Sequence, residues 1–543
     1  MTAKEYYSFQ DAFPWQEQDK VRFKGYLWDK NGRHLTAKEA VSLFRRVDGP
    51  ERLTHLLGEL DGAFAVSVQT GQGQLLAVDP MGMFSFYFCR HKDQWHISDS
   101  ATLLAERSGN KVQNRSALPE FRSAGFVLGR ECLWNNVFRI QAGEVLLLAN
   151  DGSLQGRWSQ HFLPREFSTQ GRKELYRTLC ELLDGLSRRL TASLQGRTAV
   201  VPLSGGYDSR LIAAMLKRAG HQKVICFTYG RPNAESRLSE KVAKKLGYPW
   251  IFVDYQVINP DKYLQERRFL QYIDYAGNAT SMPFLQEYFA CRHLRDNKLV
   301  PDDSIFLPGH TGDYIAGSYV EKTIKRDRNE STRYGRLVRN YFSFCRLTKA
   351  EKELITERLQ NWFQGQHFPA HADDPRYDVL TEEWDLKEKF AKFVFNAARV
   401  FPFFGYEFRL PLWDKQFRSF FRSLPFTYRA YKALYDEVLE KAYFVPMEIC
   451  FHKEELREGP PELRAQAIRR LLRPLIPASI RRRRMIGRDY ICYHRFTAAM
   501  EKELEQEGEK VPAKIRHFNA IICQWYAMRL SKQACRTGKG GPG

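Results

Sequence analysis

Residues 200–214 read VVPLSGGYDSRLIAA, and this is the most informative stretch of the chain. It begins as an apolar strand, turns at two glycines and runs directly into a helical pattern. The glycines let backbone amides approach an oxyanion closely, the serine hydroxyls add donors, and the helix contributes the positive end of its dipole. We therefore predict a phosphate-binding turn formed by Ser204, Gly205, Gly206, Tyr207, Asp208 and Ser209.

Asp208 lies among these donors, where a carboxylate would repel a polyphosphate. The arrangement is favourable only if a cation lies between them, and oxygen ligands of this kind are typical of Mg²⁺ sites. An ordinary glycine-rich turn without a ligand is the alternative. The strand before the turn, the helix after it and the interposed Asp-Ser pair favour the phosphate interpretation.

Strand and helix patterns alternate around this turn. Apolar strands at TAVVPLS, KVICFTYG and WIFVDY are separated by helical patterns at DSRLIAAMLKRAG and SRLSEKVAKKLG, an order typical of a parallel sheet with right-handed crossovers. Helical spacing begins near Gly171, and the chain from the last of these strands to about Leu530 is mostly helical in pattern. In the first 160 or so residues, short apolar runs separated by turns predict a sheet, with strands at 60–68, 74–78, 85–89 and 143–148.

The composition is that of a globular protein with several domains. The chain has 543 residues, of which 43% are hydrophobic and 27% charged, and its net charge of +21 favours acidic partners such as nucleotides, nucleic acid, uronic acids or anionic lipid headgroups. The ten cysteines are scattered without a CxxC pair, so neither a zinc site nor a disulfide scaffold is predicted. Without a signal-peptide pattern or an apolar run of ~18 residues, we expect a cytoplasmic protein with no membrane span.

The loop SGGYDS resembles the SGGxDS pyrophosphate-binding loop of the ATP pyrophosphatase superfamily, and the chain contains no GxxxxGK[ST] Walker loop. Four further segments resemble the asparagine synthetase branch, in the same order. Residues 60–87 resemble its LDGxFAF and RDxxGxxPLYY strands, and LPGHTGDYIAGSY (307–319) resembles its GEGxDExxGGY motif. Residues 396–414 resemble DRxxMxxxxExRxPxLD, and 424–439 resemble an LP…K…L helix. The sequence departs from the family at Val78, which replaces Arg, and at Ala142, which replaces Pro.

This resemblance implies an α/β protein with two domains. Residues 1–165 would form a degenerate glutamine amidotransferase domain of the N-terminal-nucleophile type, with αββα layers. Residues 166–530 would form an adenylating domain like the adenine-nucleotide α-hydrolases, a doubly wound parallel sheet with many added helices. Residues 531–543, ending in RTGKGGPG, would be a flexible tail.

The resemblance also implies the residues of an active site. Asp208 and Asp313 would hold Mg²⁺ against the ATP phosphates, although Asp313 also fits the role of a helix N-cap. His310 replaces a Glu of asparagine synthetases and a Tyr of β-lactam synthetases. Held by Glu407, it could serve as general base toward an amine, because its ordinary pKa is about 6.5. Alternatively, His310 bonds a loop carbonyl and Glu407 forms an ion pair with Arg409 or Arg399.

A late basic residue of the family stabilises negative charge on the acyl-adenylate and pyrophosphate. The nearest match is IRRRRMIGRDY, in which Arg484 or its neighbours Arg482 and Arg483 stand in place of Lys. A solvated basic face is the alternative for this run. Lys432, in the segment that resembles the LP…K…L helix, is placed near the end of the substrate domain.

At the position of the family's glutaminase nucleophile, this chain has a different residue. Family members that hydrolyse glutamine use a cysteine directly after the initiator Met, whereas this chain has Thr2, and its first cysteine is Cys89. Segments of the type NGEIYN and RRL, which hold glutamine, are absent from residues 1–62. The resemblance therefore implies an inactive glutaminase domain that is kept for packing.

These observations predict an ATP- and Mg²⁺-dependent ligase that adenylates a carboxylate, releases pyrophosphate and joins ammonia or an amine. The carboxylate would belong to a small molecule, a uronic-acid glycan or a peptide natural product. Ammonia would be free or come from a separate glutaminase, and an amine on the substrate itself would give a ring, as in β-lactam or lasso-type cyclases. The alternatives are an RNA-modifying ATP pyrophosphatase, for which no RNA module is evident, and a scaffold without activity. Whether the chain forms a homodimer stays open.

Overall fold

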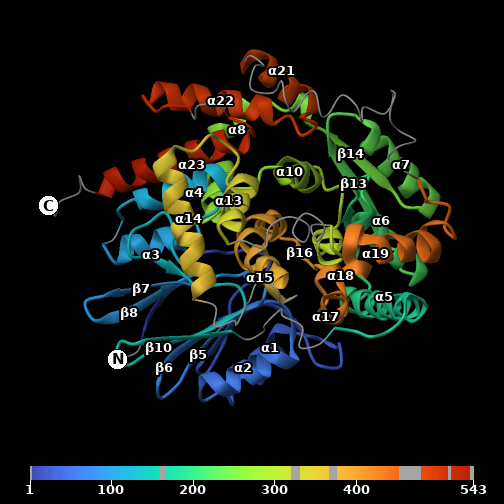
Figure 1. Cartoon of the computed structure of the whole chain (residues 1–543), viewed down its shortest axis with the longest axis horizontal. Helices are drawn as coiled ribbons and strands as arrows, with labels where there is room; N and C mark the ends of the chain where they lie inside the picture. The colour runs from blue at the N-terminus through green and yellow to red at the C-terminus, as the bar shows by residue number, and fades with distance from the viewer. Residues whose placement is uncertain are drawn as a thin grey trace.

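The computed structural model describes residues 3–109, 111–158, 167–318, 330–365, 376–451, 478–511 and 515–537. The predicted domain boundary at 165/166 falls outside these residues and stays a prediction. In Figure 1 the strands of the first 158 residues lie at the lower left, and the parallel sheet with its helices lies at the right.

The larger sheet of the amino-terminal part is antiparallel and has the order β11-β10-β6-β5-β3-β2, with β4 paired to β3. Its hydrophobic residues alternate between two faces, as a strand period of two requires. Phe64, Val66 and Val68 of β5 share a core with the helices on one face, whereas Ala63 and Ala65 belong to the core on the other face. The strands are β2 (Gln16–Gln18), β3 (Val21–Trp28), β4 (His34–Leu35), β5 (Asp61–Gln69), β6 (Gly73–Val78), β10 (Glu144–Ala149) and β11 (Leu154–Trp158), and the helices are α1 (Ala37–Phe44) and α2 (Pro50–Glu59).

A second sheet of four strands, β1-β8-β7-β9, faces the inner side of the first. Its strands are β1 (Lys4–Tyr6), β7 (Tyr87–His91), β8 (Gln94–Ser98) and β9 (Phe138–Arg139), and α3 (Ala101–Arg107) packs on β7 and β8. Trp95 of β8 donates to the Ala149 carbonyl of β10 at 3.1 Å, which ties the two sheets together. The layers are thus helix, sheet, sheet and helix, and the nucleophile-type ancestry implied by the resemblance stays a prediction.

The parallel sheet has the order β14-β13-β12-β15-β16, and all of its pairings are parallel. Its strands are β12 (Ala199–Pro202), β13 (Val224–Gly230), β14 (Trp250–Asp254), β15 (Ile305–Phe306) and β16 (Glu407–Phe408). Helices α5 (Arg172–Leu194), α6 (Tyr207–Arg218) and α7 (Ala234–Leu246) flank it, and α10 (Tyr288–Asp296) lies on the other side of β13 from α7 (Figure 1). The predicted alternation of strands and helices is confirmed.

The chain order of the strands reverses between β12 and β15, because β13 and β14 extend the sheet in one direction and β15 and β16 in the other. In doubly wound sheets, ligands bind outside the carboxyl ends of the strands at such a switch point. The fold therefore directs attention to the two loops that leave β12 and β15.

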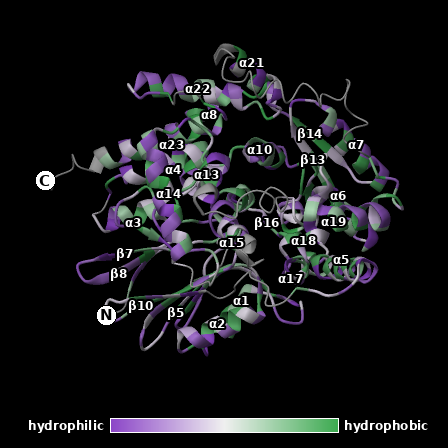
Figure 2. Ribbon diagram, in the orientation of Figure 1, coloured by the Kyte–Doolittle hydropathy of each residue, from purple (hydrophilic) through white to green (hydrophobic). Residues whose placement is uncertain are grey.

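The other described residues are mainly helical, as the sequence predicts, and Figure 2 shows hydrophilic residues along outer helices such as α22. No helix among the described residues is both long and apolar enough to cross a bilayer. The helices are α4 (Leu118–Ala124), α8 (Pro260–Leu264), α9 (Arg267–Gly277), α11 (Gly312–Ile315), α13 (Glu330–Tyr341), α14 (Lys349–Gln364), α15 (Arg376–Asp385), α16 (Val400–Phe403), α17 (Lys415–Ser423), α18 (Phe426–Arg429), α19 (Ala433–Leu439), α21 (Ala478–Arg488), α22 (Tyr493–Gln506) and α23 (Asn519–Thr537).

Residues 531–537 were expected to belong to a flexible tail, but α23 continues to Thr537. Its last turns are fixed by contacts with other elements. Lys532 forms an ion pair with Glu507 after α22 at 2.8 Å, and Gln533 contacts Asp274 of α9 at 3.5 Å. Residues 538–543 lie outside the described part of the chain.

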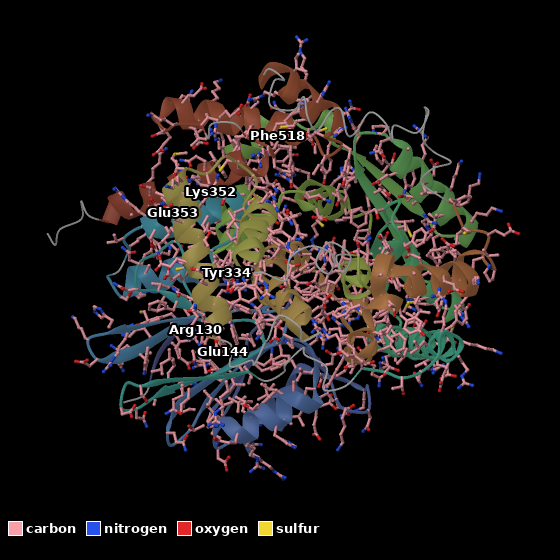
Figure 3. All side chains as sticks on the ribbon, viewed as in Figure 1. Arg130, Glu144, Tyr334, Lys352, Glu353 and Phe518 are labelled. Carbon is pink, nitrogen blue, oxygen red and sulfur yellow. The ribbon has the colours of Figure 1, made fainter. Side chains whose placement is uncertain are left out.

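The amino-terminal sheets and the rest of the chain pack directly on each other. Tyr87 of β7 hydrogen-bonds to Thr280 at 3.0 Å, and Asn278 donates to the Asp99 carbonyl at 2.8 Å. Ion pairs also stabilise the amino-terminal part internally, such as Arg130 with Glu144, which lie together in Figure 3. The buried core that begins between the two amino-terminal sheets continues into the parallel sheet.

Candidate active site

The loops that follow β12 and β15 converge on a cavity of about 560 Å³. One wall comes from the β12 loop and the start of α6, another from residues 308–313, and a third from the segment that leads into α19. The end of β13 and the start of α10 close the far side. The cavity is lined by Pro202, Ser204, Gly206, Tyr207, Asp208, Ser209, Tyr229, Gln286, Glu287, Pro308, Gly309, His310, Asp313, Lys432 and Asp436.

The predicted phosphate loop is stabilised by its own serines. Ser204 N–H donates to the Ser209 hydroxyl at 3.0 Å, and Gly206 N–H donates to the Ser204 hydroxyl at 3.2 Å. Arg210, which is fully buried, donates to the Gly205 carbonyl at 3.1 Å and fixes the loop from behind. The N-cap of α6 is Gly206, and no side chain caps the helix, so its first amides remain available to an oxyanion.

Asp208 and Asp313 come together in the structure. Asp313 N–H donates to Asp208 Oδ2 at 2.9 Å, and the Tyr435 hydroxyl donates to Oδ1 at 2.9 Å. Burial and the charge of Asp313 raise the pKa of Asp208 to about 7, although these two hydrogen bonds and Lys432 act in the opposite direction. Two neighbouring carboxylates of this kind repel each other in the absence of a cation.

A divalent cation fits this pair. Mg²⁺ typically takes one or two carboxylates and completes its shell with water and substrate phosphates. The described residues contain no group of three or more His, Cys, Asp or Glu side chains placed to hold a metal alone. Asp208 and Asp313 would therefore hold the metal together with a bound nucleotide.

Two glycines allow this convergence. A Cβ at Gly309 would lie 2.7 Å from the Ser209 nitrogen, and one at Gly312 would lie 2.8 Å from the Asp208 carboxyl carbon. Neither glycine has a positive φ, so close approach is the reason for their presence. The glycines of the segment PGHTGDY thus let the β15 loop lie directly against the start of α6.

His310 lines the cavity, but the structure does not bring Glu407 to it. Glu407 is paired with Ile305, before the carboxyl end of β15, whereas His310 follows that end. Its carboxylate instead accepts from Arg197 at 2.5 Å and from Arg409 at 2.8 Å. The predicted His310–Glu407 dyad is therefore not formed, and the alternative ion pair with Arg409 is observed.

The surroundings of His310 favour a neutral imidazole. Burial lowers its pKa to about 4, and its Nδ1 is buried without a hydrogen-bond partner. Burial alone would raise the pKa of Glu407, but Arg409 and Arg197 outweigh it, so this pKa is lowered. Glu407 thus acts as a charged partner in an ion-pair cluster.

Among the residues that the structure describes, Lys432 is the cation that lines the cavity. Arg484 is exposed on α21 and is not among the cavity-lining residues. Lys432 forms an ion pair with Asp436 at 3.2 Å and lies 5.7 Å from the centre of the Tyr207 ring. Tyr431 and Lys432 both have φ near +60°, a backbone conformation that is costly for residues other than glycine.

The sequence interpretation missed two residues that line the cavity, Tyr229 and Glu287, and one buried residue that contacts Asp208, Tyr435. Tyr435 bonds Asp208, and Tyr229 hydrogen-bonds to Glu287 at 2.8 Å. A local signal existed only for Tyr229, because it lies at the carboxyl end of a predicted strand next to the phosphate loop. Tyr435 and Glu287 lie on helical segments far along the chain, and their sequence patterns do not separate them from core residues.

The family model described as "Asparagine synthase" matches residues 185–519, well over half of the chain. No curated protein sequence is similar enough to count as a match.

Among solved structures, the chain is similar to the U34-tRNA thiolase NcsA from Methanococcus maripaludis with its [4Fe-4S] cluster, at 13% identity over 41% of this chain and 79% of that chain, with a TM-score of 0.20. It is similar to a glutamine phosphoribosylpyrophosphate amidotransferase from B. subtilis complexed with ADP and GMP, at 13% identity over 44% and 72%, with a TM-score of 0.19. It is also similar to an NH3-dependent NAD synthetase from Campylobacter jejuni, at 15% identity over 37% and 99%, with a TM-score of 0.17.

Likenesses at these TM-scores do not define a fold or an activity. The family match, by contrast, spans the predicted phosphate loop, the β15 loop, Lys432 and most of the described helices of the carboxyl-terminal half. A family of ATP-dependent amide-forming ligases is consistent with a cavity where the uncapped start of α6 lies beside two neighbouring carboxylates. The chain belongs to the asparagine synthase family.

Proposed function

We propose that this protein is an AMP-forming ligase that activates a carboxylate with ATP and joins it to an amine. The observation that carries the proposal is the contact of Asp208 with Asp313 beside the uncapped start of α6. Together they provide a polyphosphate site and a place for the Mg²⁺ that such a nucleotide carries. When bound, the metal would neutralise charge on the phosphates.

In the first step, a substrate carboxylate oxygen forms a bond to the α-phosphorus of ATP, and the bond from that phosphorus to the oxygen of pyrophosphate breaks. The loop Ser204–Ser209 holds the departing pyrophosphate through its amides and hydroxyls. Lys432 also lines the cavity, 5.7 Å from the centre of the Tyr207 ring, and supplies positive charge, a role that the sequence had suggested for Arg484. Preorganised donors and cations of this kind stabilise developing charge in a transition state.

In the second step, the amine nitrogen attacks the acyl carbon, the bond to AMP breaks, and a proton leaves the nitrogen. We propose that the His310 imidazole accepts this proton. Its pKa of about 4 refers to the protein alone, and the negative phosphates of a bound nucleotide would raise it. Because Glu407 is held elsewhere, His310 would act without a carboxylate partner.

The nitrogen source is proposed to be ammonia or an amine other than glutamine. Thr2, which replaces the nucleophilic cysteine of the family, lies outside the described residues. The match to the family over residues 185–519 favours a ligase over an RNA-modifying ATP pyrophosphatase. The carboxylate would belong to a uronic-acid glycan, a peptide or a smaller acid, and an amine on the same molecule would give a ring.

The proposal is tested by exchange of labelled pyrophosphate into ATP with a panel of carboxylates. We expect exchange that requires Mg²⁺ and at least one class of carboxylate, with AMP as the nucleotide product once an amine is added. Formation of ADP, or exchange that is independent of any carboxylate, would contradict the proposal. Ammonia release from glutamine, measured on the same preparation, is expected to stay at background.

A further inference from the structure

The cavity wall formed by the end of β13 and the start of α10 holds a carboxylate that has no role in the proposed ligase reaction. Glu287 lies where α10 begins, and Tyr229 lies near the carboxyl end of β13. Both line the cavity, together with Gln286. Glu287 occupies the N-cap position of α10 but makes no capping hydrogen bond. Helix capping therefore does not account for its charge.

The two oxygens of Glu287 have different surroundings. Oε1 accepts from the Tyr229 hydroxyl at 2.8 Å, and that hydroxyl in turn accepts from Gln286 Nε2 at 2.7 Å. Oε2 is buried without a hydrogen-bond partner, and the residue as a whole is only 8% exposed. Among the described residues, no Lys, Arg or His forms an ion pair with Glu287.

The groups around Glu287 are aromatic rather than cationic. The rings of Tyr229 and Tyr255 are stacked, with centres 5.4 Å apart and planes at 18°. Glu287 is close enough to Tyr490 to raise its pKa, which burial and other acidic neighbours bring to about 12. Burial likewise raises the pKa of Glu287 to about 7, against the lowering effect of its hydrogen bond from Tyr229. This is a buried acid whose ionised form lacks a counter-charge.

A buried carboxylate with a free oxygen is costly unless a cation compensates it, and aromatic rings next to it favour an organic cation. We propose that Glu287, Tyr229 and Gln286 form a subsite for an ammonium or guanidinium group on the carboxylate substrate. This inference rests on the proposed ligase function. It narrows the substrate to a zwitterion, with one end activated near Asp208 and a cationic end held at Glu287.

A metal ion is a poorer occupant of this subsite. One carboxylate, a phenol and an amide are too few charged oxygen ligands for Mg²⁺ or Ca²⁺. The amino group of adenine is another possible partner, but it is neutral and would leave the charge of Glu287 uncompensated. The test therefore has to separate an organic cation from the nucleotide base.

The probe for the cation is methylammonium chloride, compared with potassium chloride at equal ionic strength and at about pH 8, above the pKa of Glu287. Thermal unfolding of the full chain is the readout. We expect methylammonium to raise the melting temperature of the wild type by about 2 °C relative to potassium, because a ligand that binds only the folded state stabilises it. This difference should vanish in Glu287→Gln, which keeps an acceptor for Tyr229.

The control variant is Glu353→Gln, which removes an exposed carboxylate of α14, labelled in Figure 3, and should keep the full methylammonium effect. Tyr229→Phe removes a hydroxyl of the subsite itself and should reduce the effect, so a second variant tests the subsite if Glu287→Gln does not fold. Equal effects of methylammonium in the wild type and Glu287→Gln, or its absence from the wild type, would overturn the inference.

Binding of Mg²⁺·ATP, measured by calorimetry, separates the remaining outcomes. Glu287→Gln should bind ATP as tightly as the wild type if the subsite is for the substrate. A loss of tenfold or more would mean that Glu287 recognises the base and would overturn the inference. If the wild type binds no ATP and shows no exchange, the proposed function fails, while the methylammonium comparison still decides the subsite on its own.

Discussion

The ionised side chain of Asp208 destabilises the protein without a ligand, because it is buried next to the charge of Asp313. Its pKa of about 7 lies above the ordinary value of 3.8, so the folded state binds the proton more tightly than the unfolded state does. The contribution of Asp208 to the free energy of unfolding therefore falls as pH rises from about 4 to 7 and stays lower above that range. Mg²⁺ and nucleotide would reverse this loss by compensating the charge.

We predict that Asp208→Asn melts at a higher temperature than the wild type at about pH 8 and that the two converge near pH 4. The variant should nevertheless lose pyrophosphate exchange, because the metal loses a charged ligand. Melting curves and exchange assays on the same preparations check both parts. A variant that retains exchange at limiting Mg²⁺ would remove Asp208 from the metal site.

The second prediction concerns which cation, Lys432 or Arg484, stabilises charge during pyrophosphate exchange. Because Lys432 lines the cavity and Arg484 is exposed on α21, Lys432→Ala should slow pyrophosphate exchange by ~10²- to 10³-fold, the usual effect of losing a charge-stabilising group. Arg484→Ala should cost far less. Steady-state exchange rates at saturating ATP make the comparison, and the reverse order of effects would mean that α21 moves onto the cavity.

At the scale of elements, the site depends on how closely the β15 loop approaches α6. Gly309→Ala would place a methyl group 2.7 Å from the Ser209 nitrogen, which is backbone and cannot move aside cheaply. We expect this variant to lose exchange and about 1–3 kcal/mol of unfolding free energy, the usual cost of overpacking. Denaturant unfolding measures the second effect.

The matched control is Gly335→Ala in α13. Gly335 is exposed, and a Cβ there would meet nothing within 4 Å. Alanine has a higher helix propensity than glycine, so this variant should be more stable by roughly 0.5–1 kcal/mol and keep exchange. If Gly309→Ala and Gly335→Ala changed exchange and unfolding free energy equally, close packing would not be the reason for a glycine at position 309.

At the scale of the whole molecule, Glu407 and Arg409 connect the two halves of the chain. Arg409 is fully buried, contacts His34 of the amino-terminal sheet at 3.3 Å, and lies over the Tyr26 ring at 4.5 Å. Glu407 balances its charge and that of Arg197. The motif that suggested a catalytic Glu thus contributes to an ion-pair cluster that contacts the amino-terminal sheet.

We predict that Glu407→Gln destabilises the protein by about 1–3 kcal/mol at neutral pH, the range for hydrogen bonds to charged groups. The pKa of Glu407 is lowered in the fold, so its contribution is present above its ordinary pKa of about 4.5 and is lost as pH falls through the lowered value. The gap between variant and wild type should therefore close in acid, as melting curves across pH will show. A selective loss of amide formation with unchanged stability would restore a catalytic role.

The parallel sheet around β12, β13 and β14 and the turn from β12 into α6 could be predicted from the sequence, whereas phosphate binding by that turn stays a prediction. The sheet and the turn follow from local signals, since the apolar periodicity, the two glycines and the helix start all lie within a few residues of each other. The pairing of Asp208 with Asp313 was also predictable, because each follows a strand of one sheet and such loops meet at its carboxyl edge.

Which charged side chains contact each other depends on the tertiary fold and could not be predicted from the sequence. Glu407 bonds Arg197 across 210 positions of the chain, and Tyr435 bonds Asp208 across 227. Lys432 is placed at the cavity by a left-handed backbone turn at Tyr431 and Lys432. This turn was not predictable, because the two residues that adopt positive φ are not glycines. Oε2 of Glu287 is buried without a hydrogen-bond partner because of the residues that pack around it, and these come from distant parts of the chain. Contacts between distant parts of the chain determine how deeply each carboxylate is buried and whether a cation lies next to it. Burial and neighbouring charges in turn determine the pKa of each carboxyl group and whether it stays without a partner in the protein.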